Sequence, residues 1–131
     1  FVKNIINQMI NRREVSAISD NCGSPTNAED LANLICRIVY SQKWFPGIYN
    51  FSNKGSISTY DFVNEINSLC DFDFSVVIKP INSKDYSSIV KRPKYSVLCN
   101  KKINKVFKIR QIDYKSSLKK CIVKIKNHHK F

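Results

Sequence analysis

The sequence predicts a single α/β domain. Segments with strand patterns alternate with segments with helix patterns along the chain, which is typical of α/β folds. The chain has 131 residues, of which 43% are hydrophobic, enough for one domain with its own core and too few for two. No internal repeat, low-complexity segment or long linker divides it. We therefore expect one domain over residues 1–131.

The first third of the chain predicts a helix, a strand, a turn and a second helix. Apolar residues in FVKNIINQMI recur at helical spacing and predict a helix to about Asn11. This helix lacks an N-capping residue and the chain starts at Phe1, so we expect the sequence to be truncated at its start. VSAISD alternates as a half-buried strand over 15–20, and the second helix is predicted from about Asn27 to Gln42. The apolar face of that helix consists of Ala28, Leu31, Leu34, Ile35, Ile38 and Val39.

The rest of the chain predicts two more strands and three more helices. GIYNFS, residues 47–52, is expected to be a short strand, and Ser58 is expected to cap the helix that follows. SVVIKPI, residues 75–81, predicts another strand. The remaining predicted elements are a short helix over about 101–107 and a last helix from about Asp113.

The segment DNCGSPTNAEDLA, residues 20–32, is the best candidate for a ligand-facing loop. A turn that ends in proline at the start of a helix is rigid, and it leaves backbone N–H groups that an anion or a polar ring can use. Pro25 and Thr26 are expected to shape this turn. The sequence alone does not say which ligand it faces.

Positive charge is concentrated at the end of the chain. Residues 91–131 hold 14 of the 22 Lys and Arg residues and one of the ten acidic residues, for a net charge of +13, whereas residues 1–90 carry −1. A small basic nucleic-acid-binding module is therefore the alternative interpretation. Aromatic residues are not interleaved with the lysines, as stacking on bases requires, so we do not expect nucleic acid as a partner.

Cysteine and histidine usage excludes several kinds of site. The five cysteines are irregularly spaced without a Cys-x-x-Cys pair, which excludes a disulfide framework and a zinc site. Cys36, Cys70 and Cys121 are expected on apolar helix faces, and a reducing cytoplasm is the expected location. His128 and His129 are adjacent and terminal, so a Ser-His-Asp or Cys-His arrangement is not expected. No apolar stretch is long enough to predict a membrane span, so we expect no membrane partner.

The sequence provides no glycine-rich phosphate loop. It has only three glycines, at positions 23, 47 and 55, and neither Gly-x-Gly-x-x-Gly nor Gly-Lys-Ser/Thr occurs. The chain is not expected to hold a dinucleotide unaided.

Four motifs in order carry a resemblance to a known family. FVK, DNCGSPTNAEDLA, GIYNFSNKGSISTYDF and KRPKYSVL resemble, collinearly, segments of the C-terminal half of the dTDP-4-dehydrorhamnose reductase family of extended short-chain dehydrogenases/reductases. The resemblance implies the substrate-binding C-terminal part of an NADPH-dependent oxidoreductase, without the main Rossmann portion. The NADPH site and the catalytic Tyr and Lys would then lie outside this chain, which alone is expected to be inactive. A non-catalytic relative of the reductase is a further alternative.

The resemblance also implies substrate-binding residues for a dTDP-sugar. Arg92 is the main candidate for the diphosphate, because a guanidinium forms bidentate pairs with phosphate oxygens. Lys3 could meet the diphosphate or point to water. Ile18, Asp20 and Asn21 are expected near the thymine base, although Asp20 and Asn21 could instead cap a turn.

Two further expectations concern assembly. Some members of the family are thought to share a magnesium ion between subunits through acidic residues near the end of the first helix. The sequence here reads Arg12-Arg13-Glu14, which does not favour such a metal. By the same resemblance GIYNF joins the Rossmann sheet, so the isolated chain would have an unpaired edge and form homodimers or be poorly soluble.

Overall fold

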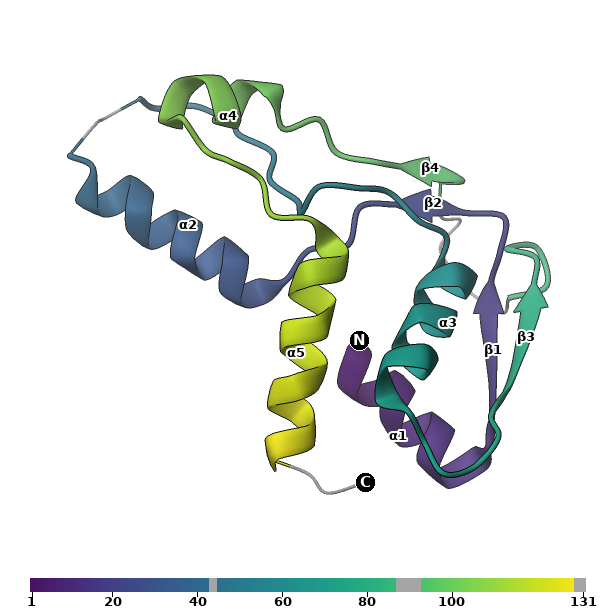
Figure 1. Cartoon of the computed structure of the whole chain (residues 1–131). Coiled ribbons are helices and arrows are strands. Elements are labelled where there is room, and N and C mark those ends of the chain that lie inside the picture. The colour runs from purple at the N-terminus through teal and green to yellow at the C-terminus, as the bar shows by residue number, and fades with distance from the viewer. Residues whose placement is uncertain (43–44, 87–92, 129–131) are drawn as a thin grey trace.

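A computed structural model describes residues 1–42, 45–86 and 93–128. Within these ranges the chain has five helices and two small parallel sheets, which confirms the predicted α/β class (Figure 1). No helix in these ranges combines the length and the apolar character that a membrane span requires. In chain order the elements are α1 (Val2–Arg12), β1 (Glu14–Ile18), β2 (Cys22–Gly23), α2 (Ala28–Tyr40), α3 (Thr59–Cys70), β3 (Val77–Ile81), β4 (Tyr95–Ser96), α4 (Lys101–Phe107) and α5 (Tyr114–His128).

The main core lies where α1, α3 and α5 meet the first sheet. β1 pairs with β3 in parallel, with Val15 opposite Ile78, and the alternation along β1 buries Val15 and Ala17. These side chains pack against apolar residues that α1, α3 and α5 present at helical spacing. The other fully buried members of the core are Ile5, Ile6, Met9, Val63, Ile66, Cys70, Leu118 and Ile122.

The helix predictions are confirmed, with ends that move by one to two residues. Ser58 caps α3 as expected, because its hydroxyl accepts a 3.0 Å hydrogen bond from the N–H of Asp61. Asn27 caps α2, and α4 has the expected bounds. Both predicted strands of the first sheet form over shorter ranges, and Asp20 lies beyond the end of β1.

The prediction of a strand over 47–52 is wrong. This segment is extended but pairs with no strand in the described part of the chain. At its end, Ser52 meets a side chain instead of a strand: the Asn100 amide accepts from the Ser52 N–H (3.1 Å) and donates to its carbonyl oxygen (3.0 Å). The pairing of β2 with β4, two residues each, was not predicted, because strands this short leave no periodic pattern.

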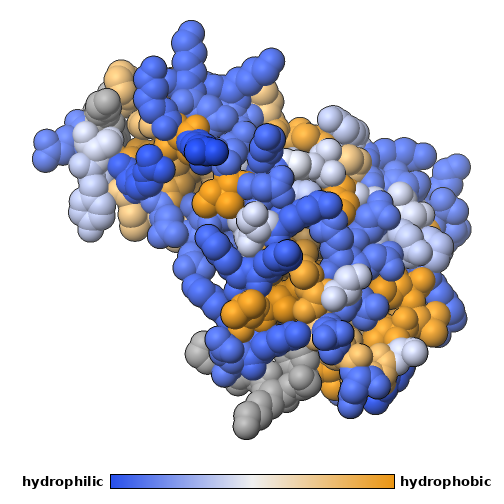
Figure 2. Space-filling model, viewed as in Figure 1, coloured by the Kyte–Doolittle hydropathy of each residue, from blue (hydrophilic) through white to orange (hydrophobic). Residues whose placement is uncertain are grey.

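The apolar face of α2 is largely exposed, contrary to the pattern of its sequence. Leu34 is buried, but Ile35 is 53% exposed and Val39 68% exposed. Cys36, expected on an apolar face, is exposed too. The extensive packing contacts among the described elements involve α1, α3, α5 and the strands, not α2. α2 projects from the core beside α4, and Figure 2 shows hydrophobic residues reaching the surface in this part of the molecule.

Candidate functional site

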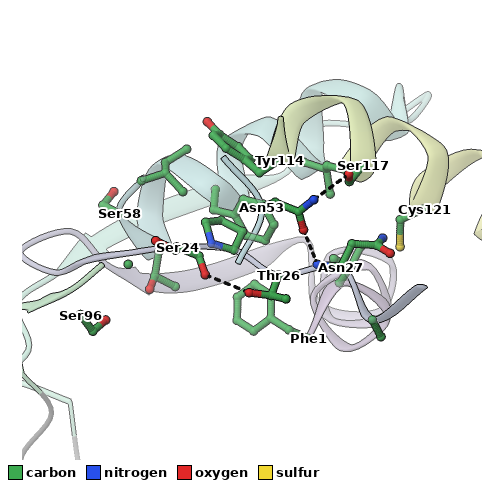
Figure 3. Close-up of a pocket in the computed structure, with 18 of the residues that line it drawn as sticks. Phe1, Ser24, Thr26, Asn27, Asn53, Ser58, Ser96, Tyr114, Ser117 and Cys121 are labelled. Carbon is green, nitrogen blue, oxygen red and sulfur yellow. Dashed lines mark hydrogen bonds between the residues drawn. The ribbon is translucent and has the colours of Figure 1, made fainter. Parts of the chain in front are cut away.

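A pocket of about 670 Å³ opens between the start of α1, the 23–28 turn and the first half of α5. Phe1, Val2 and Lys3 line it from the start of α1, and Tyr114, Leu118 and Cys121 line it from α5. Figure 3 shows Phe1, Tyr114 and Cys121 around it. Polar residues complete the lining. They are Asn21, Ser24, Thr26, Asn27, Asn53, Ser58, Thr59, Ser96 and Ser117.

The predicted ligand-facing loop lines this pocket. β2 lies between β4 and the Ile57 backbone, with which Gly23 exchanges two hydrogen bonds of 3.0 and 3.1 Å. These pairings hold the Gly-Ser-Pro-Thr turn against the cavity. The turn then leads directly into α2, so the sequence motif and the pocket coincide.

The start of α2 offers fewer free N–H groups than the sequence suggested. The Asn27 side chain accepts hydrogen bonds from the N–H groups of Glu29 (2.9 Å) and Asp30 (3.1 Å). The N–H of Asn27 itself donates to Asn53 Oδ1 at 2.7 Å. A capped helix start with two acidic residues in its first turn does not suit an anion.

The start of α1 is the better place for negative charge. Phe1 occupies the N-cap position without a side-chain cap, and the first turn of α1 has no acidic residue. Lys3 is exposed and is the one cation among the described residues that line the pocket. The positive end of the helix dipole and an ammonium group therefore face the same opening.

The structure brings two of the predicted site residues to the pocket. Lys3 and Asn21 line it, whereas Ile18 and Asp20 do not. The Asn21 side chain is used in bonds to Thr59, donating to its hydroxyl (2.8 Å) and accepting from its N–H (3.0 Å). Arg92 lies outside the described residues.

Asp20 ties two loops together. Its carboxylate accepts hydrogen bonds from the Ser83 N–H (2.7 Å) and hydroxyl (2.8 Å), and the Lys94 ammonium lies 3.6 Å away. These hydrogen bonds, with a smaller contribution from Lys94, lower the pKa of Asp20. Of the two roles left open for Asp20, this geometry is that of a cap, made across 63 positions of sequence instead of within its own turn.

Sequence reasoning missed the α5 side of the pocket. Tyr114 is 7% exposed and donates a 3.0 Å hydrogen bond to Glu65. Burial, with that hydrogen bond and the Glu65 charge adding to it, raises the pKa of Tyr114, so the phenol stays protonated at neutral pH. Burial likewise raises the pKa of the Cys121 thiol, so Cys121 presents an uncharged group to the pocket. The sequence has no local signal for this wall, because Gly55 lies against the Tyr114 ring only in the fold.

The lining suits binding, and its ionisable side chains are Lys3, the Tyr114 phenol bonded to Glu65 and the Cys121 thiol. Among the described residues that line the pocket, none is Asp, Glu or His. No group of three or more His, Cys, Asp or Glu side chains in the described ranges could hold a metal ion. The described glycines do not fit a dinucleotide either: Gly23 lies in β2, and Gly47 and Gly55 lie in loops away from any strand-to-helix turn.

Comparison with known proteins places this geometry in a family. The model of the RmlD substrate binding domain matches residues 1–127. The dTDP-4-dehydrorhamnose reductase of Aggregatibacter actinomycetemcomitans is 30% identical over 132 residues, covering 91% of this chain and 43% of the relative. The spore coat polysaccharide biosynthesis protein SpsK of Bacillus subtilis is 31% identical over 103 residues, covering 79% of this chain and 35% of the relative.

Solved structures agree with the sequence relatives. A dTDP-4-dehydrorhamnose reductase from Clostridium acetobutylicum matches 96% of this chain and 44% of its own at 32% identity, with a TM-score of 0.86. The reductase from Bacillus anthracis, solved in complex with NADP, matches 95% and 43% at 27% identity, with a TM-score of 0.85. The chain thus spans less than half the length of these relatives. The predicted resemblance is confirmed, and the chain belongs to the RmlD substrate binding domain family.

Proposed function

We propose that this chain is the sugar-nucleotide-binding part of an NADPH-dependent dTDP-4-dehydrorhamnose reductase, the oxidoreductase that completes dTDP-L-rhamnose for cell-surface polysaccharide. One observation carries the proposal. In a domain that matches the RmlD substrate binding domain, a pocket of polar and apolar side chains with one lysine opens at the start of α1, whose first turn has no acidic residue. Such a pocket suits a ligand with a ring, hydroxyl groups and a diphosphate.

The chain's own contribution is to bind and orient. Its pocket is lined by no Asp, Glu or His in the described ranges, the Tyr114 phenol is bonded to Glu65, and its glycines do not form a dinucleotide site. NADPH supplies hydride when it is bound, and we assign its site to a part of the protein outside this chain, as the roughly twofold greater length of the relatives allows. We expect no reductase activity from the 131 residues alone.

Lys3 and Arg92 are the proposed partners of the diphosphate, and Asn21 lies beside the proposed base site. Lys3 and Asn21 line the pocket. The case for Arg92 rests on the KRPKYSVL motif. For Ile18 and Asp20 we keep the proposal of a place near the base, Asp20 acting through the loop that it ties to Ser83.

Titration calorimetry with dTDP tests the proposal. We expect dTDP to bind the chain, Lys3→Ala to weaken binding about tenfold and Arg92→Ala to abolish it, because each removes a positive charge from the diphosphate. Lys119→Ala, an exposed lysine of α5 outside the pocket, is the matched control and should leave binding unchanged. No dTDP binding, together with tight and salt-sensitive binding of an oligonucleotide, would establish the basic nucleic-acid module instead.

Self-association of the isolated chain remains part of the proposal, for a different reason from the one first expected. Residues 47–52 form no strand, so they present no regular edge. The exposed apolar side chains of α2 offer a surface that favours association, Val39 above all. Light scattering at high concentration should show dimers or larger species, and a monodisperse monomer would contradict this.

A further inference from the structure

We propose that Asn53 is a positioning residue for the pocket: it holds the start of α2 and the start of α5 at the separation that the ligand needs. The proposal rests on the proposed function, since the ligand is the dTDP moiety assigned above. Figure 3 shows the Asn53 side chain between the Ser117 side chain of α5 and the backbone nitrogen of Asn27 at the cap of α2, with a hydrogen bond to each.

Asn53 makes hydrogen bonds to three separate segments. Its Oδ1 accepts from the Asn27 N–H at 2.7 Å, and its Nδ2 lies 2.6 Å from Asp30 Oδ2 in the first turn of α2. The same Nδ2 lies 3.1 Å from Ser117 Oγ and 3.3 Å from the Ile112 carbonyl oxygen. The Ser117 hydroxyl in turn donates to Asp30 at 2.5 Å. One amide therefore connects the starts of two helices.

Burial makes this connection strong. Asn53 is 1% exposed and Ser117 3% exposed, so water does not compete for their bonds. The two bonds that Asp30 accepts, from Asn53 and Ser117, are charge-assisted, which about doubles their strength relative to neutral pairs. Removing one side chain of the cluster would leave its buried partner without a hydrogen bond, which lowers the stability of the whole cluster.

The helix that Asn53 holds packs less extensively than α1, α3 and α5, with Leu34 as its one buried residue among those described. The extensive packing in the described part of the chain does not involve α2. An ion pair between Glu29 and Lys124, at 2.7 Å, also joins α2 to α5, but both side chains are more than half exposed. Exposed pairs contribute little, so the buried cluster carries the alignment.

Both elements that Asn53 joins form walls of the pocket. Asn27 and Ala28 line it from α2, and Ser117 and Leu118 line it from α5. Asp30 belongs to the cluster without lining the pocket. Loss of the Asp30 charge would by itself favour an anionic ligand. Weaker binding after Asp30→Ala would therefore have to pass through the position of the walls, which separates positioning from direct contact.

Asn53→Ala and Asp30→Ala test the proposal in the 131-residue chain. We expect each to weaken dTDP binding about tenfold, as loss of a buried network of this kind predicts. Hydrogen exchange should accelerate in the first turns of α2 and α5 and stay unchanged in α1, α3 and β1. Glu29→Ala is the matched control: it removes a first-turn carboxylate that bonds to α5 at the surface, and it should change affinity less than about twofold.

The double variant Asp30→Asn with Asn53→Asp should bind dTDP more tightly than either of these single exchanges. The carboxylate introduced at position 53 would still accept from the Asn27 N–H, and the amide introduced at position 30 would donate to that carboxylate. The amide–carboxylate pair is then re-formed with its direction reversed. The Ile112 carbonyl oxygen loses its 3.3 Å donor, so the recovery is expected to be incomplete. An Asn53 that acted only by touching the ligand with its amide would not give this rescue, because the exchange moves the amide to position 30, which does not line the pocket. If Asn53→Ala does not fold, Asp30→Ala and the double variant carry the same test.

Other outcomes overturn one proposal or the other. Unchanged hydrogen exchange and unchanged dTDP affinity in both alanine variants would refute the positioning role. Faster hydrogen exchange throughout the core would also refute it, as would a double variant that binds no more tightly than the single variants. If the unmodified chain binds no dTDP, the proposed function fails. Hydrogen exchange at the starts of α2 and α5, compared between the unmodified chain and the alanine variants, then still decides whether Asn53 aligns the walls of the pocket.

Discussion

Gly55 is the position where the structure predicts the sharpest loss of stability from a single methyl group. A Cβ at Gly55 would lie 2.6 Å from Cδ1 and 2.8 Å from Cε1 of Tyr114, closer than carbon atoms approach. The ring cannot turn away freely, because Tyr114 is 7% exposed and its hydroxyl is bonded to Glu65 at 3.0 Å. Gly55 also has φ of +110°, which side-chain-bearing residues rarely adopt.

The cost of Gly55→Ala has two parts. Forcing a methyl group into filled space costs about 2 kcal/mol, and the unfavourable backbone conformation costs about 2 kcal/mol more. We therefore expect the free energy of unfolding to fall by about 4 kcal/mol, a large share of the total for a domain of this size. Urea unfolding followed by helical circular dichroism measures it.

Gly23→Ala is the control. Its Cβ would lie 3.1 Å from the Ser96 hydroxyl oxygen, the end of a small exposed side chain that can rotate, so the change should stay within about 0.5 kcal/mol. Tyr114→Leu in the Gly55→Ala background should recover the steric part, visible as non-additivity of about 2 kcal/mol in a double-mutant cycle. A Gly55→Ala chain as stable as the unmodified one, or equal costs at both glycines, would refute the reasoning.

Two other predictions concern acid stability and association. Hydrogen bonds from Ser83 lower the pKa of Asp20 in the folded state from its ordinary 3.8. The carboxylate therefore stabilises the fold fully above 3.8, and this contribution is lost as the pH falls through the lower pKa of the folded state. Asp20→Asn should show a smaller loss of stability than the unmodified chain in urea unfolding between about pH 5 and pH 2. Equal acid sensitivity would show that the Ser83 contact does not matter. Val39→Glu places a charge on the exposed face of α2 and should shift light scattering toward monomer, whereas an unchanged mass would exclude that face as the contact.

The helices could be predicted from the sequence because an N-cap residue, where there is one, and the apolar spacing that follows it lie close together in the chain. The Ser58 cap and the apolar spacing after it are sufficient to locate α3, and the repeat of Ile5, Ile6 and Met9 locates α1. The strand expected over 47–52 failed because an alternating pattern says nothing about whether a partner strand is present, and here Asn100 meets the backbone instead.

The site was predictable in part for the same reason. The Gly-Ser-Pro-Thr turn has a local signature and does line the pocket. The cluster around Asn53 has none, because Asn27, Asn53 and Ser117 are ordinary polar residues until the fold brings them together across 26 and 64 positions. The sequence predicted free N–H groups at the start of α2, with Asn27 as its first residue. In the structure Asn27 is the N-cap, and its side chain accepts hydrogen bonds from those N–H groups.

Nuclear magnetic resonance titration of the labelled chain with dTDP tests the central claim most directly, since it reports where the ligand binds. The account predicts saturable shifts of backbone amides around the pocket, at Val2, Lys3, Gly23 and Leu118, with the amides of the far end of α2 unaffected. Absence of shifts, or shifts confined to the exposed lysines of α4 and α5, would contradict it.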